Sequence, residues 1–176
     1  MIKDYFKKYC SYYLSKYSVT KKKFENILKK KISRDFMQKK IDEKQYKNLF
    51  KEINDVLEHY KKIGFFDEQN LMDIKLEHFI KRGFSPKKME YELNKNFFDK
   101  NLIATKLKKI VETENIIELL IENYLHKTRL LQQMKRDQKS NKECFDKILK
   151  KLLQQGFGQY ESINFLKNKF SLDGNF

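Results

Sequence analysis

The sequence contains no tryptophan, one proline and only five glycines among its 176 residues. β-Sandwiches and β-barrels need frequent turn residues, so a chain this poor in glycine and proline favours helices. Fifteen phenylalanines and ten tyrosines must supply the bulk of any core, because tryptophan is absent. A chain of this length can bury a sizeable core, either as one domain or as an array of smaller units. We therefore predict an all-α protein.

Cysteine and histidine are also scarce, which removes most metal-binding and nucleophile patterns. Cys10 and Cys144 stand far apart in the sequence and fit no metal-ligand spacing. We expect both to be free, buried thiols in a reducing compartment. His59, His78 and His126 each fall in a predicted helix, with no second ligand or orienting acid at a useful spacing. We expect all three at surface or boundary positions.

Two other patterns that could carry chemistry have simpler explanations. The glycines at 156 and 158 fit a helix end and a corner rather than a loop that cradles phosphate. Asp67 and Glu68 could pass for a metal-binding pair, but the helix dipole favours carboxylates at a helix start. We therefore predict that the protein is not an enzyme and uses neither cofactor nor metal.

Acidic residues are in the minority. Lys and Arg number 39 against 24 Asp and Glu, a formal net charge of +15. The first 65 residues hold 18 of the cations against 8 acids, so two thirds of the excess lies in the first third of the chain. This asymmetry indicates a polyanion or an acidic protein as the partner. The alternative is that an AT-rich genome favours lysine codons and that the excess merely solvates the surface.

Long hydrophobic runs are missing as well. The most apolar stretch, Ile116 to Leu125, is interrupted by Glu118 and Glu122, and the N-terminus shows no apolar core of a signal peptide. We expect a soluble, cytoplasmic protein that binds no membrane and is a monomer.

The most completely specified local structure is the corner at residues 81–93. Gly83 can adopt the left-handed conformation that ends a helix. Ser85 is a good N-cap, and Pro86 falls at the first helical position, where its missing N–H costs nothing. Thr20 is placed to cap an earlier helix in the same way, and Asp99 a later one. The sequence therefore predicts helix–turn–helix corners.

Apolar spacing at three and four residues predicts the helices themselves. They cover approximately residues 2–17, 21–32, 45–63, 68–82, 86–96, 100–111, 115–134, 144–153 and 160–169. Residues 33–44 fit either a loop or a helical extension, residues 135–141 resemble a break, and we expect the tail to residue 176 to be frayed.

The corners recur at regular spacing. Thr20 and its helix align with Ser85 and its helix at an offset of 65, and Gly83 aligns with Gly156 at an offset of 73. This pattern predicts an elongated array of three tandem three-helix repeats, which are helix-turn-helix-like units. The first repeat covers residues 1–65, with an insertion at about 33–44. The second covers residues 66–113, and residues 114–176 form a linking helix and the third repeat.

A basic three-helix unit can bind nucleic acid through the helix that follows its corner. The exposed faces after Thr20 are nearly all lysine, which suits phosphate contact but is poor for reading bases. We predict that partner or nucleic-acid contacts gather beside the first two corners. The predicted contact residues are Lys21, Lys22, Lys23, Lys29, Lys30, Lys81, Arg82, Lys87 and Lys88. An equally open alternative is that these cations only solvate two helix faces.

Three segments resemble the RecX family, whose members modulate the bacterial recombinase RecA. Residues 63–68, Ile-Gly-Phe-Phe-Asp-Glu, resemble the family's Leu-Gly-Tyr-Leu-Asp-Asp junction. Residues 82–89, Arg-Gly-Phe-Ser-Pro-Lys-Lys-Met, together with Leu93, are similar to its Arg-Gly-Tyr-Gly-Pro-Arg-Arg-Ile segment and the later Leu. Residues 152–157 resemble its C-terminal Arg-Gly-Phe corner. The segments occur in the family's order, and the resemblance spans nearly the whole chain.

The sequence also departs from the family pattern. Gln154 and Gln155 stand where the family commonly has arginine, and residues 33–44 resemble an insertion. Lysine replaces arginine widely, which keeps the charge but loses bidentate hydrogen bonding.

The resemblance implies a non-enzymatic regulator that binds along the filament of RecA on single-stranded DNA. Such a protein would restrain the ATPase, strand-exchange and coprotease activities of RecA, and so act in homologous recombination, DNA repair and the SOS response. It would contact RecA protomers, and direct contact with single- or double-stranded DNA stays open. Two alternatives remain open from the residues alone. The chain could be a stand-alone basic DNA-binding protein, or a helical scaffold for an acidic protein partner.

Overall fold

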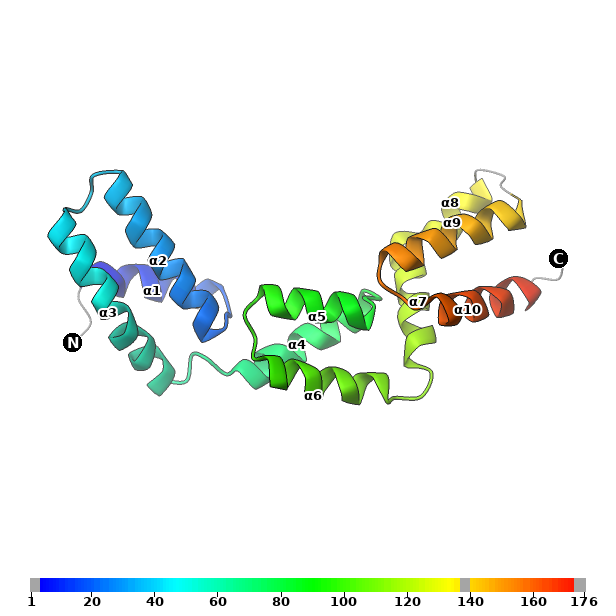
Figure 1. The fold of residues 1–176 in the computed structure, drawn as a ribbon, viewed down its shortest axis with the longest axis horizontal. Coiled ribbons are helices and arrows are strands. Elements are labelled where there is room, and N and C mark those ends of the chain that lie inside the picture. Colours follow the sequence, from blue (N-terminus) through cyan, green and yellow to red (C-terminus); the bar gives the residue numbers. More distant parts are fainter. Residues whose placement is uncertain (1–3, 137–139, 173–176) are drawn as a thin grey trace. The chain divides into compact units, whose positions relative to one another are not determined.

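The computed structural model describes residues 4–136 and 140–172 and contains ten helices and no strands in these ranges (Figure 1). The prediction of an all-α protein is therefore confirmed. The helices are α1 Asp4–Lys16, α2 Lys21–Met37, α3 Glu43–Lys62, α4 Glu68–Lys81, α5 Pro86–Lys95, α6 Lys100–Val111, α7 Ile116–Thr128, α8 Leu130–Arg136, α9 Asn141–Gln154 and α10 Gln159–Leu172. None of these helices is both long and apolar enough to cross a membrane.

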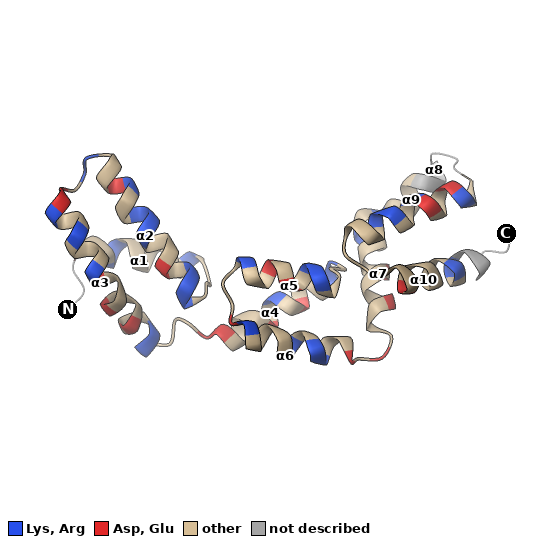
Figure 2. Cartoon of the chain, in the orientation of Figure 1, with Lys and Arg blue, Asp and Glu red and all other residues tan. Residues whose placement is uncertain are grey.

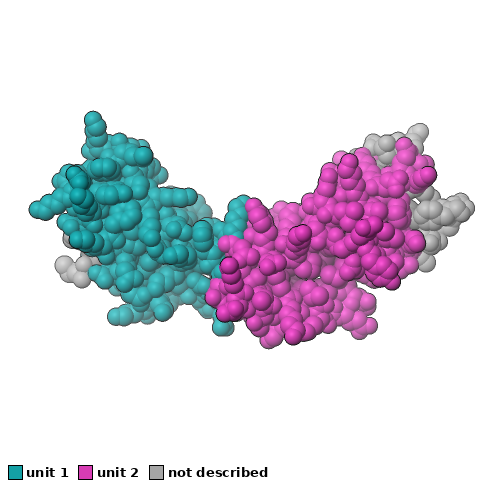
Figure 3. Space-filling view, in the orientation of Figure 1, with its two compact units in different colours: residues 1–73, 95–98 teal, residues 74–94, 99–176 magenta. Residues whose placement is uncertain are grey.

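The chain packs as two compact units (Figure 3). Unit 1 comprises residues 1–73 and 95–98, and unit 2 comprises residues 74–94 and 99–176. The boundary changes how the charge is divided. Unit 1 holds 19 Lys and Arg against 11 Asp and Glu, and unit 2 holds 20 against 13, which gives +8 and +7. The cationic excess is therefore shared almost evenly between the units, although it looks concentrated when counted along the sequence.

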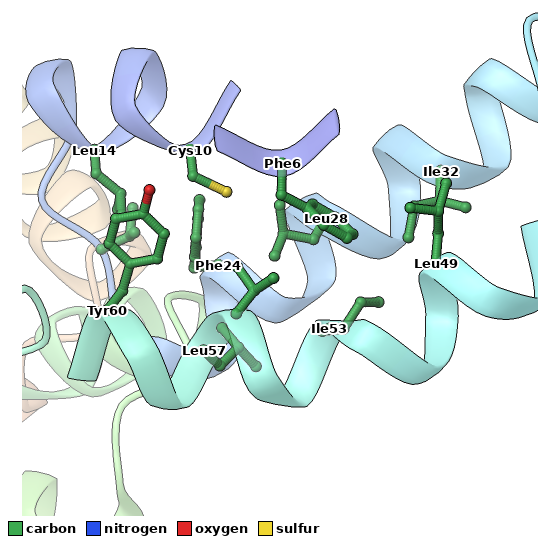
Figure 4. Packing of buried hydrophobic residues seen from close by; sticks show 12 residues of the cluster. Phe6, Cys10, Leu14, Phe24, Leu28, Ile32, Leu49, Ile53, Leu57 and Tyr60 are labelled. Carbon is green, nitrogen blue, oxygen red and sulfur yellow. The ribbon is translucent and has the colours of Figure 1, made fainter. Parts of the chain in front are cut away.

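The core of unit 1 forms where α1, α2 and α3 meet (Figure 4). Each helix contributes one stripe of side chains at three- and four-residue spacing, as the apolar pattern predicted. These buried residues include Phe6, Cys10, Leu14, Phe24, Leu28, Ile32, Leu49, Ile53, Leu57 and Tyr60. Burial raises the pKa of the Cys10 thiol to about 12, so this thiol stays protonated and unreactive. Cys10 and Cys144 are both free and buried, as predicted.

One charged group is buried at the edge of this core. Asp35 on α2 is 6% exposed and accepts hydrogen bonds at 2.7 Å from both Tyr5 Oη on α1 and Lys31 Nζ. Burial alone would raise the pKa of Asp35, but these two hydrogen bonds outweigh it and hold the pKa below its ordinary value. The ionised carboxylate thus fastens α1 to α2.

Unit 2 is built around the corner between α4 and α5. A Cβ added to Gly83 would lie 2.1 Å from the backbone N of Tyr124 and 2.5 Å from the carbonyl O of Leu120. Asn123 of α7 donates a 3.0 Å hydrogen bond to the Ile80 carbonyl near the end of α4. The corner therefore lies directly on the backbone of α7, and only glycine fits there. The buried apolar side chains of unit 2 include Leu76, Phe79, Met89, Leu93, Leu120, Ile121, Ile148, Leu152 and Leu166.

The helix ends test the predictions made from local signals. Gly83 has φ +65°, Pro86 opens α5, and the side chains of Thr20 and Asp99 cap α2 and α6, all as predicted. Asp67 also caps its helix, because its carboxylate accepts a 3.0 Å hydrogen bond from the Asn70 N–H. The dipole explanation of the Asp67–Glu68 pair therefore agrees with its place at the start of α4.

Residues 33–44 are mostly helical. α2 continues to Met37, a short turn follows, and Asp42 caps α3 in a reciprocal capping box with Gln45. The sequence left this segment open between loop and helix, and the structure assigns its first half to helix.

The prediction of one helical stretch over residues 115–134 is wrong. Arg129, at φ +51°, separates α7 from α8. Leu125 and Leu130 are both buried, yet five residues on a continuous helix would set them about 140° apart. The break lets both side chains face the interior, and no glycine or proline signals it.

The later break and the tail fall partly outside the described residues. Lys135 and Arg136 belong to α8, Ser140 caps α9 in a second capping box with Glu143, and residues 137–139 lie outside the description. The end of the chain predicted to fray, residues 173–176, lies outside it as well. The last helix is longer than predicted and extends to Leu172.

Candidate interface at the helix corners

At the first corner, before α2, two side chains form hydrogen bonds with Asn96. The Thr20 hydroxyl accepts a 3.1 Å hydrogen bond from the Lys23 N–H and donates one of 2.9 Å to the Asn96 carbonyl. The Lys23 ammonium donates a 2.6 Å hydrogen bond to the side-chain Oδ1 of the same asparagine. Thr20 is 1% exposed, so its hydroxyl has both roles filled without water.

The second corner, before α5, repeats this contact with Gln155. The Ser85 hydroxyl accepts a 3.2 Å hydrogen bond from the Lys88 N–H and donates one of 2.5 Å to the Gln155 carbonyl. The Lys88 ammonium donates a 2.5 Å hydrogen bond to Gln155 Oε1. Ser85 is fully buried. We call each such set of three residues a corner lock: Thr20–Lys23–Asn96 lies in unit 1 and Ser85–Lys88–Gln155 in unit 2.

The two locks share a physical logic. Both acceptors directly follow the last residue of a helix, where backbone carbonyls lack N–H partners inside the helix. Each is followed by a residue with positive φ, Phe97 at +60° or Gly156 at +87°. The N-cap hydroxyl of another helix donates to this carbonyl, and the ammonium of the lysine three residues later donates to the amide oxygen of the same residue's side chain. The lock thus joins the start of one helix to the end of another.

Most of the predicted lysines at the first corner form ion pairs or hydrogen bonds with other residues of the chain. Lys21 pairs with Glu58 at 2.5 Å, while Lys22 and Lys29 pair with Glu25 at 2.9 and 2.6 Å. Hydrogen bonds from Lys29 and Lys22 hold the pKa of Glu25 below its ordinary value. These three lysines are therefore partly neutralised by carboxylates.

Lys23, the fourth of these lysines, belongs to the corner lock. Lys30, the fifth, is exposed, and its ammonium has no partner in the described ranges. Lys30 is thus the cation of this group that remains available to an external anion.

The predicted cations at the second corner are freer. Lys81, Arg82 and Lys87 are exposed and form no ion pair within the part of the chain that the structure describes. Arg82 lies over the Phe84 ring at 4.8 Å, and Lys88 lies over the same ring at 4.5 Å. Lys88 is held by its lock and is half-buried. Blue bands in Figure 2 mark these basic residues along α2 and at the first turn of α5.

Five of the nine predicted contact residues thus lie in unit 1 and four in unit 2. Lys23 and Lys88 have a structural role in the locks. Lys30, Lys81, Arg82 and Lys87 keep exposed, unneutralised charge.

The structure also shows where the three histidines lie and whether metal-ligand side chains gather. His59, His78 and His126 are all exposed, as predicted. The described residues contain no cluster of three or more His, Cys, Asp or Glu side chains arranged to hold a metal ion.

Comparisons with known proteins return no match. No protein-family model, curated protein or solved structure matches this chain.

Sequence reasoning missed the acceptors of both locks. Asn96 and Gln155 lie 76 and 70 residues from the hydroxyls that they bind. One signal was present: the offset of 65 that aligns Thr20 with Ser85 also aligns Lys23 with Lys88. In both copies a lysine follows the N-cap hydroxyl by three residues. This spacing indicates one acceptor residue that offers its backbone oxygen to the hydroxyl and its side-chain oxygen to the lysine.

Proposed function

We propose that this protein is a non-enzymatic regulator that binds the filament of RecA on single-stranded DNA and restrains the activities of RecA. The observation that carries the proposal is the exposed, unneutralised charge of Lys30, Lys81, Arg82 and Lys87 beside two corners of the same construction. A filament that carries DNA offers phosphates and acidic protein surface to such cations. The order and spacing of the segments that resemble the RecX family support the same choice.

The proposal includes the three tandem three-helix repeats at residues 1–65, 66–113 and 114–176. The recurrence of the corner lock supports a repeated unit, because two segments of different sequence place a hydroxyl and a lysine in the same roles. The third corner differs, with Gly158 and Glu161 where the second has Ser85 and Lys88.

The mechanism follows from charge and rigidity. The locks and the backbone contact of Gly83 fix the corners, so their exposed cations are held at set positions rather than on mobile loops. Cations fixed in this way can bridge neighbouring groups on a filament and oppose the changes that accompany ATP hydrolysis. No chemical step is required of the protein.

The test is the DNA-dependent ATPase of RecA with substoichiometric amounts of the protein added, together with co-sedimentation with filaments. The triple variant Lys81→Gln, Arg82→Gln, Lys87→Gln should weaken both effects. A matched control removes three exposed charges elsewhere in unit 2, with Lys100→Gln, Lys109→Gln and Lys127→Gln. Equal losses with both triple variants would show that net charge alone acts, and no inhibition by the unaltered protein would reject the proposal.

A second candidate is a stand-alone DNA-binding protein, which the net charge of +8 on unit 1 and +7 on unit 2 favours. It predicts duplex binding without RecA and a log affinity that falls linearly with log salt. A flat salt response rejects it. Binding to neither DNA nor RecA, with an acidic protein as the partner, would instead support the helical scaffold.

A further inference from the structure

The turn between α2 and α3 presents large apolar side chains to solvent. Met37 is 83% exposed and Phe36 is 40% exposed. This exposure excludes a core role for Met37. The turn lies in unit 1, inside the segment 33–44 that departs from the family pattern, and it contains none of the nine predicted contact residues.

The turn is nonetheless well fixed. The Lys40 N–H donates to the Asp35 carbonyl and the Lys39 N–H to the Phe36 carbonyl, both at 2.9 Å, while Lys39 adopts φ +56°. These bonds form the left-handed cap that ends many helices. On the other side, Asp42 holds the start of α3 through its capping box. The exposed side chains are therefore presented by a fixed backbone.

Phe36 is the end of a row of aromatic rings. Its ring centroid lies 4.7 Å from that of Tyr46, and Tyr46 lies 4.8 Å from Phe50. Tyr46 and Phe50 are half-buried and pack against the core of unit 1. The row supports the Phe36 ring from behind, so that its exposed side can accept another flat ring.

A hollow of about 580 Å³ opens beside this ring, lined by Phe36, Met37, Lys39, Lys40, Ile41 and Asp42. The hollow is shallow and open to solvent, so a ligand that occupies it stays partly exposed. Lys39 and Lys40 are exposed, and their ammonium groups have no partner within the described ranges. The hollow thus combines an aromatic ring, exposed apolar side chains and two ammonium groups, with the Asp42 carboxylate at its edge held by the Gln45 N–H.

We propose that this hollow binds a segment of single-stranded nucleic acid, with a base stacked on Phe36 beside Met37 and the adjoining phosphates on Lys39 and Lys40. Aromatic platforms flanked by cations bind single strands in this way, because every base has a stacking face. A duplex fits poorly, since its bases are already stacked on each other. This inference does not depend on RecA and is tested without it, so either proposal can fail alone.

The first test uses the absence of tryptophan. Phe36→Trp introduces the only tryptophan of the chain, and Tyr91→Trp is the matched control at a site 63% exposed on α5 of unit 2. With an oligothymidylate of about 12 nucleotides, the fluorescence of the Phe36→Trp variant should be quenched while that of the control hardly changes. Equal responses in the two variants would overturn the proposal.

The second test measures affinity for the same labelled strand by fluorescence anisotropy. Phe36→Ala should weaken binding by about 5- to 150-fold, the range for loss of one stacked base, and Tyr91→Ala by less than about 2-fold. Lys39→Gly with Lys40→Gln should reduce the slope of log affinity against log salt by about 1.4. Glycine suits the positive φ at position 39, so the first change removes charge without adding strain.

Two other outcomes would overturn the proposal. One is a matching duplex that binds as tightly as the single strand and equally through Phe36. The other is a blue shift of the Phe36→Trp emission on phosphatidylglycerol vesicles with no quenching by the strand, which would assign the turn to a membrane surface instead.

Discussion

The two corner locks make the same hydrogen bonds in different surroundings. At Thr20 the corner is bordered by charge: the Lys21 N–H donates to Glu68 at 3.1 Å, and the Lys21 ammonium donates to Glu58. At Ser85 the corner is instead pressed onto the backbone of α7 through Gly83. The two corners share the hydroxyl, the lysine and the amide acceptor. They differ in the contacts that the neighbouring residues make.

This difference shows which part of the corner is needed for the turn itself. The hydroxyl recurs because it donates to a carbonyl at a helix end, where carbonyls lack N–H partners within their own helix. The lysine recurs because it donates to the side-chain oxygen of the same residue. Gly83 serves the left-handed end of α4 and the close packing onto α7, and the first corner does without it, since Ser18 stands at the aligned position before Thr20. Both units therefore use the corner lock, whereas the packing around it differs between them.

The largest effect should come from Gly83→Ala. The added Cβ would strike the α7 backbone and stand at positive φ, so we expect a loss of about 3 to 5 kcal/mol in the free energy of unfolding. Gly64 also has positive φ, +82°, but no atom lies within 4 Å of its added Cβ. Gly64→Ala should therefore cost only about 1 to 2 kcal/mol. Urea unfolding followed by circular dichroism measures both, and equal losses would refute the close packing.

The next largest losses of stability should come from removal of the two lock hydroxyls. Ser85→Ala and Thr20→Val each remove a helix cap and the hydrogen bond from a buried hydroxyl to a carbonyl at another helix end, for an expected cost of about 2 kcal/mol in each case. Ser140 caps α9 but is exposed, and within the described residues its hydroxyl contacts Glu143 of the same helix. Ser140→Ala should cost about 1 kcal/mol or less. A cost for Ser140→Ala as large as for the two locks would show that capping alone explains them.

The hydrogen bonds that Lys23 and Lys88 donate to the amide side chains should contribute smaller and similar coupling energies. Double-mutant cycles of Lys88→Met with Gln155→Leu, and of Lys23→Met with Asn96→Leu, should each give a coupling of about 0.5 to 1 kcal/mol. Lys22 pairs with Glu25 rather than with the amide, so Lys22→Met with Asn96→Leu should give almost no coupling. Coupling in only one lock would break the equivalence of the two corners.

The smallest effect should appear as a difference in acid sensitivity. The described carboxylates with a clearly lowered pKa, Glu25, Asp35 and Glu58, all lie in unit 1. A lowered folded-state pKa stabilises the fold above the unfolded value and loses that contribution as pH falls through the folded value. Unit 1 should therefore lose amide protection before unit 2 as pH falls below about 4.

Hydrogen exchange resolved by residue measures this order. Asp35→Asn should reduce the pH dependence in unit 1 and leave unit 2 unchanged. Simultaneous loss of protection in both units would contradict the assignment.

Local signals were enough to predict most of the fold. Gly83, Ser85 and Pro86 fix their corner through interactions within a few residues, and the structure places each in its expected role. The break at Arg129 could not be predicted, because tertiary burial of Leu125 and Leu130 causes it rather than any local preference. For the same reason the sequence predicted Lys23 and Lys88 as contact residues but could not show their amide acceptors on other helices.

The stacking residue proposed at Phe36 was hidden for a different reason. In the sequence an exposed phenylalanine looks like a core residue, and only the fold shows that the α2–α3 turn leaves it in solvent. The charged residues of the corners were visible from composition, but whether each was free or neutralised depended on Glu25 and Glu58, which the fold brings to them.

The most direct test of the account is the rate of ATP hydrolysis by RecA on single-stranded DNA, measured as the protein is added at substoichiometric amounts. The account predicts a falling rate, with a weaker fall for the Lys81→Gln, Arg82→Gln, Lys87→Gln variant than for the control triple variant. An unchanged rate, with no protein sedimenting with the filaments, would contradict it.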